Sequence, residues 1–143
     1  MANDNSLEGK RIAFFIPAPI EGSGGIGEIF NRARAMTAAG AEVDMIVKDN
    51  VGKTGLELQA ESMQFYGKHD FGVHLASQDT PGNYDLMIAT AHDTPRMIQK
   101  LSPPAAMYLV QDYEAYFMPL GGNYILAENG YSLGYPPITL GNW

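Results

Sequence analysis

The sequence contains no cysteine among its 143 residues, and only three histidines and one tryptophan. Without cysteine, the chain can form neither a disulfide bond nor a thiolate metal site. Positive charge is also scarce, because nine basic residues stand against 16 acidic ones and the formal net charge is −7. Nucleic acids and anionic membrane surfaces are bound through basic patches, so neither is an expected partner.

Long apolar runs are missing as well. No stretch approaches the roughly 18 apolar residues needed to span a bilayer. The N-terminal residues MANDNSLEGK lack the apolar segment of a secretory signal. We therefore expect a cytoplasmic protein. The histidines show no HxH or HxxxH spacing, so no metal site is expected.

What the chain does contain is an alternation of short apolar runs with helical patterns. Apolar runs predict strands over residues 11–16, 43–47, 72–75, 84–89, 107–110 and 138–140. Helices are predicted over residues 26–39, 56–63, 95–101 and 121–133. This order predicts an α/β fold, a doubly wound and mainly parallel Rossmann-like sheet with helices on both faces. We expect residues 1–9 to be flexible and residues 10–143 to form the domain.

Helical periodicity also predicts which faces are buried. In helix 26–39 one face comprises Ile26, Ile29, Phe30, Ala33 and Thr37, and two arginines, Arg32 and Arg34, fall largely on the opposite side. In helix 121–133 the residues near one face are Ile125, Leu126, Asn129 and Leu133.

Three polar loops follow predicted strands, at residues 21–28, 90–94 and 111–114. Ligands of open α/β sheets bind outside the carboxyl ends of the strands, so these loops are expected to converge on one site. The candidate site residues are Gly22, Ser23, Gly24, Gly25, His92, Asp93, Gln111, Asp112, Tyr113 and Glu114.

The glycine-rich loop leads into a helix N-terminus, where free backbone N–H groups suit a phosphate. It formally satisfies G-x-G-x-x-G through Gly22, Gly24 and Gly27, and Asp49 lies about where a ribose-binding acid falls. However, residues 17–21 separate the strand from the first glycine. Glu28, expected in the first helical turn, would repel a phosphate. A turn needed only for backbone geometry is the alternative.

The other two loops carry titratable side chains. His92 could hydrogen-bond a sugar hydroxyl or shuttle a proton, or it could belong to a loop that merely caps the next helix. Asp93 could be a base, but capping of that helix by Asp93 or Thr94 is the simpler interpretation. Asp112 and Glu114 could divide acid and base roles or orient hydroxyl groups. A carboxylate–tyrosine network that packs the loop is the alternative.

The last third of the chain carries a family resemblance. Residues 106–141 read AMYLVQDYEAYFMPLGGNYILAENGYSLGYPPITLG. The VQDYE-x-YF run, the A-E-x-x-Y-x-L-G-Y helix and the I-T-L-G strand resemble the N-terminal domain of family 4 glycosyltransferases. The likeness is greatest to rhamnosyltransferase-like enzymes of bacterial surface polysaccharide synthesis. Residues 22–39 match at the other end, where Gly24 and Gly25 correspond to the family's glycine pair.

The resemblance implies one half of a GT-B enzyme, with a missing C-terminal domain that binds most of the nucleotide sugar. The implied reaction transfers a sugar such as rhamnose from a nucleotide diphosphate sugar to a glycan acceptor, with retention and without a metal or other cofactor. Residues 22–25 would approach the donor phosphates or the sugar, and residues 111–114 would line the acceptor side with His92 and Asp93. Alone, this part would be inactive. The full enzyme could contact the inner face of the membrane peripherally.

Two alternatives belong to other functional classes. An NAD(P)-binding Rossmann oxidoreductase domain would rest on Gly22, Gly24, Gly27 and Asp49. A non-catalytic, flavodoxin-like binding module would use the fold without the chemistry.

Overall fold

The computed structural model describes residues 7–49, 51–76, 80, 82–111 and 119–139. Within these residues strands and helices alternate along the chain. The order is β1 (Arg11–Ile16), α1 (Gly24–Ala38), β2 (Glu42–Val47), α2 (Gly55–Tyr66), β3 (Gly72–Leu75), β4 (Leu86–Ala89), α3 (Thr94–Leu101), β5 (Ala106–Val110), α4 (Gly122–Tyr131) and β6 (Pro137–Thr139). Each predicted element is present, with ends that move by a few residues.

The described residues form one six-stranded sheet in which every pair is parallel, in the order β3-β2-β1-β4-β5-β6. β1 lies at the centre, so Phe14 pairs with Met45 of β2 and with Ile88 of β4. The predicted α/β fold is thereby confirmed. The order reverses between β1 and β4, which makes the carboxyl ends of these strands the switch point of the sheet. This is the strand order of dinucleotide-binding folds and not the 2-1-3-4-5 order of flavodoxin-like folds.

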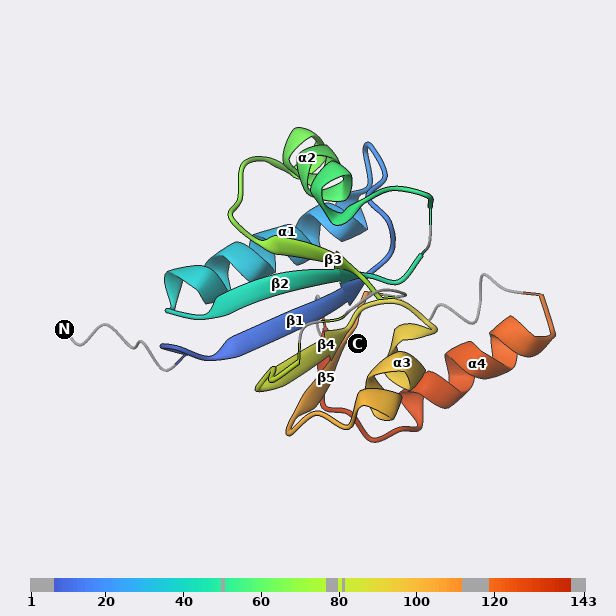
Figure 1. The fold of residues 1–143 in the computed structure, drawn as a ribbon. Coiled ribbons are helices and arrows are strands. Elements are labelled where there is room, and N and C mark those ends of the chain that lie inside the picture. The colour runs from blue at the N-terminus through green and yellow to red at the C-terminus, as the bar shows by residue number, and fades with distance from the viewer. Residues whose placement is uncertain (1–6, 50, 77–79, 81, 112–118, 140–143) are drawn as a thin grey trace.

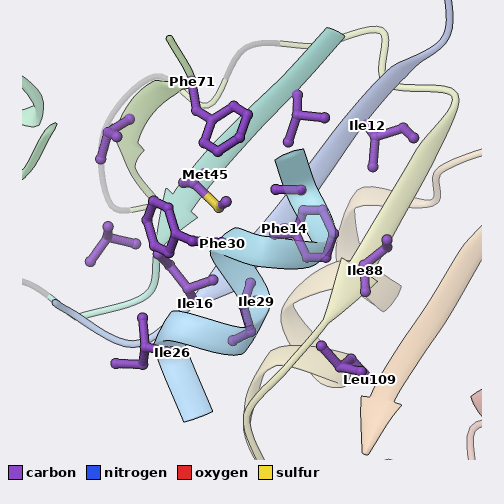
Figure 2. Packing of buried hydrophobic residues seen from close by; sticks show 14 of the residues in the cluster. Ile12, Phe14, Ile16, Ile26, Ile29, Phe30, Met45, Phe71, Ile88 and Leu109 are labelled. Atoms are coloured by element: carbon purple, nitrogen blue, oxygen red, sulfur yellow. The ribbon is translucent and has the colours of Figure 1, made fainter. Parts of the chain in front are cut away.

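Helices cover both faces of the sheet: α1 and α2 lie on one side and α3 and α4 on the other (Figure 1). Successive side chains of a strand point to opposite faces. Ile12, Phe14 and Ile16 of β1 therefore pack under α1 (Figure 2), whereas Ala13 and Phe15 pack on the side of α3. Burial on both faces explains why β1 reads as a continuous apolar run.

The face predicted for α1 is confirmed for Ile26, Ile29, Phe30 and Ala33, which are its buried residues. Thr37, predicted on the same face, is exposed at the end of the helix. Phe30 lies at the centre of this core (Figure 2). Its ring stacks on Tyr66 at a centroid distance of 4.9 Å and lies 6.1 Å from the ring of Phe71. The aromatic contacts join α1 to the end of α2 and the start of β3.

The face predicted for α4 is wrong. Its buried residues are Ala127 and Gly130, whereas Ile125 is 58% exposed. A Cβ at Gly130 would lie 3.3 Å from the ring of Pro95 in α3. Close approach of the two helices selects small residues there, and this requirement overrides the apolar pattern.

Arg34 also departs from its predicted place on the solvent side of α1. Its guanidinium donates hydrogen bonds to the backbone carbonyls of Tyr66, at 2.6 Å, Gly67, at 3.1 Å, and Lys68, at 3.4 Å. Carbonyls at a helix C-terminus have no partner within the helix, and positive charge is favourable beside them. Arg34 is therefore the side chain that fastens the end of α2 to α1.

We expect Arg34→Ala to lower the free energy of unfolding by about 1 to 3 kcal/mol, because charge-assisted hydrogen bonds to partly buried carbonyls are lost. Arg32→Ala is the matched control on the same helix. It removes an (i, i+4) pair with Glu28 at 3.4 Å and should cost about 0.5 kcal/mol or less. Urea unfolding of both variants measures the difference. Equal losses of unfolding free energy in the two variants would contradict the role of Arg34 in holding the end of α2 against α1.

Candidate functional site

The predicted glycine loop is part loop and part helix. α1 begins at Gly24, after Ser23, whose Oγ accepts a hydrogen bond from the N–H of Ile26. Gly22 has a φ of +79°, a conformation that favours glycine, while Gly25 lies in the first helical turn without a positive φ. Glu28 lies beyond that turn, which contains no acidic residue, because the helix begins two residues earlier than predicted. Glu28 nevertheless lines a shallow cavity beside the helix end together with Gly22, Ser23 and Gly24, so its charge still faces that side of the glycine loop.

The segment between β1 and α1 is anchored at two points. The carboxylate of Asp49 accepts a hydrogen bond from the N–H of Ala18 at 3.0 Å. The hydroxyl of Tyr66 accepts from the N–H of Ile20 at 2.9 Å and donates to its carbonyl at 2.7 Å. These bonds hold the loop over the carboxyl end of the sheet.

After β4 the chain turns directly into α3. Thr94 Oγ1 accepts hydrogen bonds from the N–H groups of Thr90 and Ala91 and donates to the carbonyl of Ala91. Asp93 occupies the predicted N-cap position of α3, but its side chain makes no capping hydrogen bond. Thr94 instead closes the turn, which leaves the Asp93 carboxylate for a different contact.

Gln111 closes the site from the end of β5. Its Nε2 donates a hydrogen bond to the carbonyl of Gly25 at 2.7 Å. A Cβ at Gly25 would lie 2.7 Å from Gln111 Oε1, so the amide occupies the space that the glycine leaves open. Asp112, Tyr113 and Glu114 lie outside the described residues.

The predicted convergence of the three loops is therefore present in its described part. One cavity of about 350 Å³ lies at the switch point. It is lined by Pro17, Ile20, Ser23, Gly25, Ile26, Ile29, Lys48, Thr90, Ala91, His92 and Gln111. Gly22, Gly24 and Asp93 are not in its wall, although they lie next to residues that are.

Lys48, which the sequence analysis did not single out, is the cation of this cavity. Its ammonium lies 2.9 Å from Asp49 Oδ1 and 3.1 Å from Asp93 Oδ2. Burial lowers its pKa, but the two carboxylates more than compensate and hold that pKa above its usual value. A lone lysine after a strand carries no sequence signal, so only the fold reveals that it faces two acids.

Asp49 contributes stability at neutral pH that is lost in acid. Desolvation raises its pKa, but hydrogen bonds from Lys48 and Ala18 and the charges of Lys48 and His92 outweigh this and hold the pKa below 3.8. Because the folded-state pKa is lowered, the stabilisation is full above that ordinary value and fades as the pH falls below it. Asp49→Asn should therefore destabilise the protein near neutral pH, with a gap from wild type that narrows below about pH 4. Urea unfolding across this range measures the gap. A stability difference between wild type and Asp49→Asn that does not change with pH would contradict the lowered pKa of Asp49.

A larger cavity, of about 450 Å³, lies at the opposite edge of the sheet, near the start of β2. Two of its polar lining residues, Arg34 and His69, already have partners within the protein. Arg34 binds the carbonyls that end α2, and His69 contacts Ser62 Oγ at 2.6 Å and the N–H of Phe71 at 3.1 Å. Ligands of open α/β sheets bind at the carboxyl edge, so we place the candidate site at the smaller cavity.

Comparison with models of known protein families gives no match for this chain, and comparison with curated proteins gives none either. Among the described residues, no helix is long and apolar enough to cross a membrane. The same part of the chain contains no group of three or more His, Asp or Glu side chains placed to hold a metal ion.

Proposed function

We propose that this chain is the acceptor-side half of a retaining GT-B glycosyltransferase, acting in the cytoplasm on a nucleotide diphosphate sugar and a glycan acceptor. The observation that carries the proposal is the convergence of Gly25, His92 and Gln111 on one cavity at the switch point. These residues come from the three loops that the family resemblance assigns to the interdomain cleft. In a GT-B enzyme this edge of the sheet faces a second Rossmann-like domain.

Within this proposal each loop has a chemical role. The first turn of α1 lets the donor approach the backbone at Gly25, while His92 and Gln111 offer polar side chains to sugar hydroxyls. Asp93 does not line the cavity, and it acts by holding the ammonium of Lys48 through an ion pair. The C-terminal domain binds the nucleotide, and the charge of the diphosphate is met there by basic side chains and helix dipoles, without a metal.

A direct test is the transfer reaction. The enzyme, with the C-terminal domain that the proposal requires, is incubated with a panel of nucleotide diphosphate sugars and glycan acceptors, and the product anomer is identified by NMR. We expect transfer with retention. The reading frame beyond residue 143 should encode a second α/β domain of about 150 to 200 residues. Absence of both transfer and that domain would reject the proposal.

Strand order favours a second candidate, an NAD(P)-binding domain, because 3-2-1-4-5-6 is the order of dinucleotide-binding folds. Three features weigh against it. The Asp49 carboxylate already binds Lys48 and the N–H of Ala18, and a long segment separates β1 from Gly22. A Cβ at Gly27 would lie 3.7 Å from the ring of Tyr66, so this glycine faces α2. In the dinucleotide fingerprint the third glycine packs the helix against a strand. Tight binding of NADH in a calorimetric titration would reverse this preference.

A further inference from the structure

We propose that Lys48 and its two carboxylates make the switch-point cavity selective for a neutral, hydroxyl-bearing part of the substrate and against phosphate. This inference deepens the proposed function and rests on it, because that function makes the cavity part of the substrate site. It also decides between the two donor groups, phosphate and sugar, that the glycine loop could approach.

The geometry holds the ammonium of Lys48 in one place. The side chain is 13% exposed, and two of its three N–H donors are given to Asp49 and Asp93. Lys48 nevertheless lines the cavity, so the third donor remains for an oxygen atom of a ligand. Asp49 also accepts a hydrogen bond from the N–H of Ala18, so the ammonium of Lys48 is fixed relative to the loop before α1.

The charge balance excludes an anion. One ammonium is shared by two carboxylates, so Lys48, Asp49 and Asp93 together carry a net charge of about −1 near neutral pH, and His92 is the other titratable group that acts on them. Asp93 Oδ1 is buried and accepts no hydrogen bond from the described residues, so only Oδ2, through Lys48, has a partner among them. A phosphate beside this group would meet net repulsion in a partly desolvated setting, where screening is weak.

A sugar hydroxyl meets the same surroundings without that penalty. Its oxygen can accept from the ammonium of Lys48, and its proton can be donated to an oxygen in the wall, such as Gln111 Oε1. Buried donors and acceptors are costly when unpaired, so binding is favourable for a ligand whose hydroxyl groups form hydrogen bonds with all of them. Lys48 therefore acts as a specificity-determining residue, which Asp49 and Asp93 position.

The test is a titration of the isotope-labelled chain followed by amide NMR shifts, with methyl α-rhamnoside as the neutral probe and inorganic pyrophosphate as the anion. In the wild type, the rhamnoside should shift the amide signals of Gly25, Thr90 and His92, and pyrophosphate should not. Asp93→Asn should strengthen pyrophosphate binding at these residues by about ten-fold, because one negative charge is removed. Asp70→Asn removes the same charge at the opposite edge of the sheet and should change nothing.

Lys48→Met should weaken rhamnoside binding by about ten-fold, and Lys48→Arg should keep part of it. Signal dispersion shows whether each variant is folded. If Lys48→Met does not fold, the gain of pyrophosphate binding in Asp93→Asn decides the question alone, since a purely structural role for the triad would not produce a gain.

Three results would overturn the inference: pyrophosphate shifting these amides in the wild type, no shift with the rhamnoside, or no gain of pyrophosphate binding in Asp93→Asn. The proposed function fails separately. Rhamnoside binding without sugar transfer by the enzyme would reject the glycosyltransferase and keep the charge selection. Sugar transfer by an enzyme whose cavity binds pyrophosphate would keep the glycosyltransferase proposal and reject the charge selection.

Discussion

Phe30→Ala is expected to lower the free energy of unfolding by about 3 to 5 kcal/mol, the range of large-to-small changes in tightly packed cores. Phe30 is fully buried, and its ring touches three others, those of Tyr66, His69 and Phe71. The substitution removes apolar contacts and leaves a cavity between α1, α2 and the sheet. Neighbouring rings cannot fill it easily, because hydrogen bonds to Ile20 and Ser62 hold Tyr66 and His69.

Urea unfolding monitored by circular dichroism measures this loss. Ile125→Ala is a suitable control, because it also shortens an apolar side chain in a helix, but one that is 58% exposed. Its cost should be about 0.5 kcal/mol or less. A similar cost for the two variants would mean that the face assigned to α1 is wrong.

Gly25→Val is expected to reduce kcat/KM of the proposed sugar transfer by about ten-fold or more, which corresponds to about 1.4 kcal/mol of transition-state stabilisation. The new Cβ would lie 2.7 Å from Gln111 Oε1, so the valine displaces the amide that binds the Gly25 carbonyl. Both residues line the cavity, so its shape changes where the donor would approach.

Gly24→Val provides the matched control for this loss. Gly24 lies in the same helical turn, but a Cβ there would have no heavy atom within 4 Å. Steady-state kinetics with both substrates varied, together with melting curves, separates activity from stability. The melting temperatures of the two variants should stay close, because the Gln111 amide is the flexible end of a side chain and can move. If a folded Gly25→Val enzyme had wild-type kinetics, the first turn of α1 could not be part of the active site.

The sheet could be predicted because its strands have a strong and local signal. β1 and β4 are buried on both faces, so each appears in the sequence as a short, continuous apolar run. Glycine, proline or polar residues mark the two ends of each run. Parallel pairing then follows from the helices between the strands. The order of the strands brings Gly25 and Gln111 together although 86 residues separate them.

The features that could not be predicted depend on contacts between distant elements. Gly130 is buried because Pro95 of α3 comes close to it, and nothing in the sequence of α4 indicates this neighbour. Arg34 and Lys48 look like ordinary surface cations. Each finds its partners, the carbonyls that end α2 or the two aspartates, only after the chain has folded.

The position of β1 at the centre of the sheet has a consequence for synthesis on the ribosome. β2, one of its two neighbours, ends at Val47, whereas β4, the other, ends at Ala89, about 40 residues later. At about 5 to 20 residues per second, β4 is translated roughly 2 to 8 s after β2, and until then one backbone edge of β1 has no partner strand. During that interval the nascent chain exposes an unpaired edge strand, a template for pairing with other chains and a natural target for a chaperone.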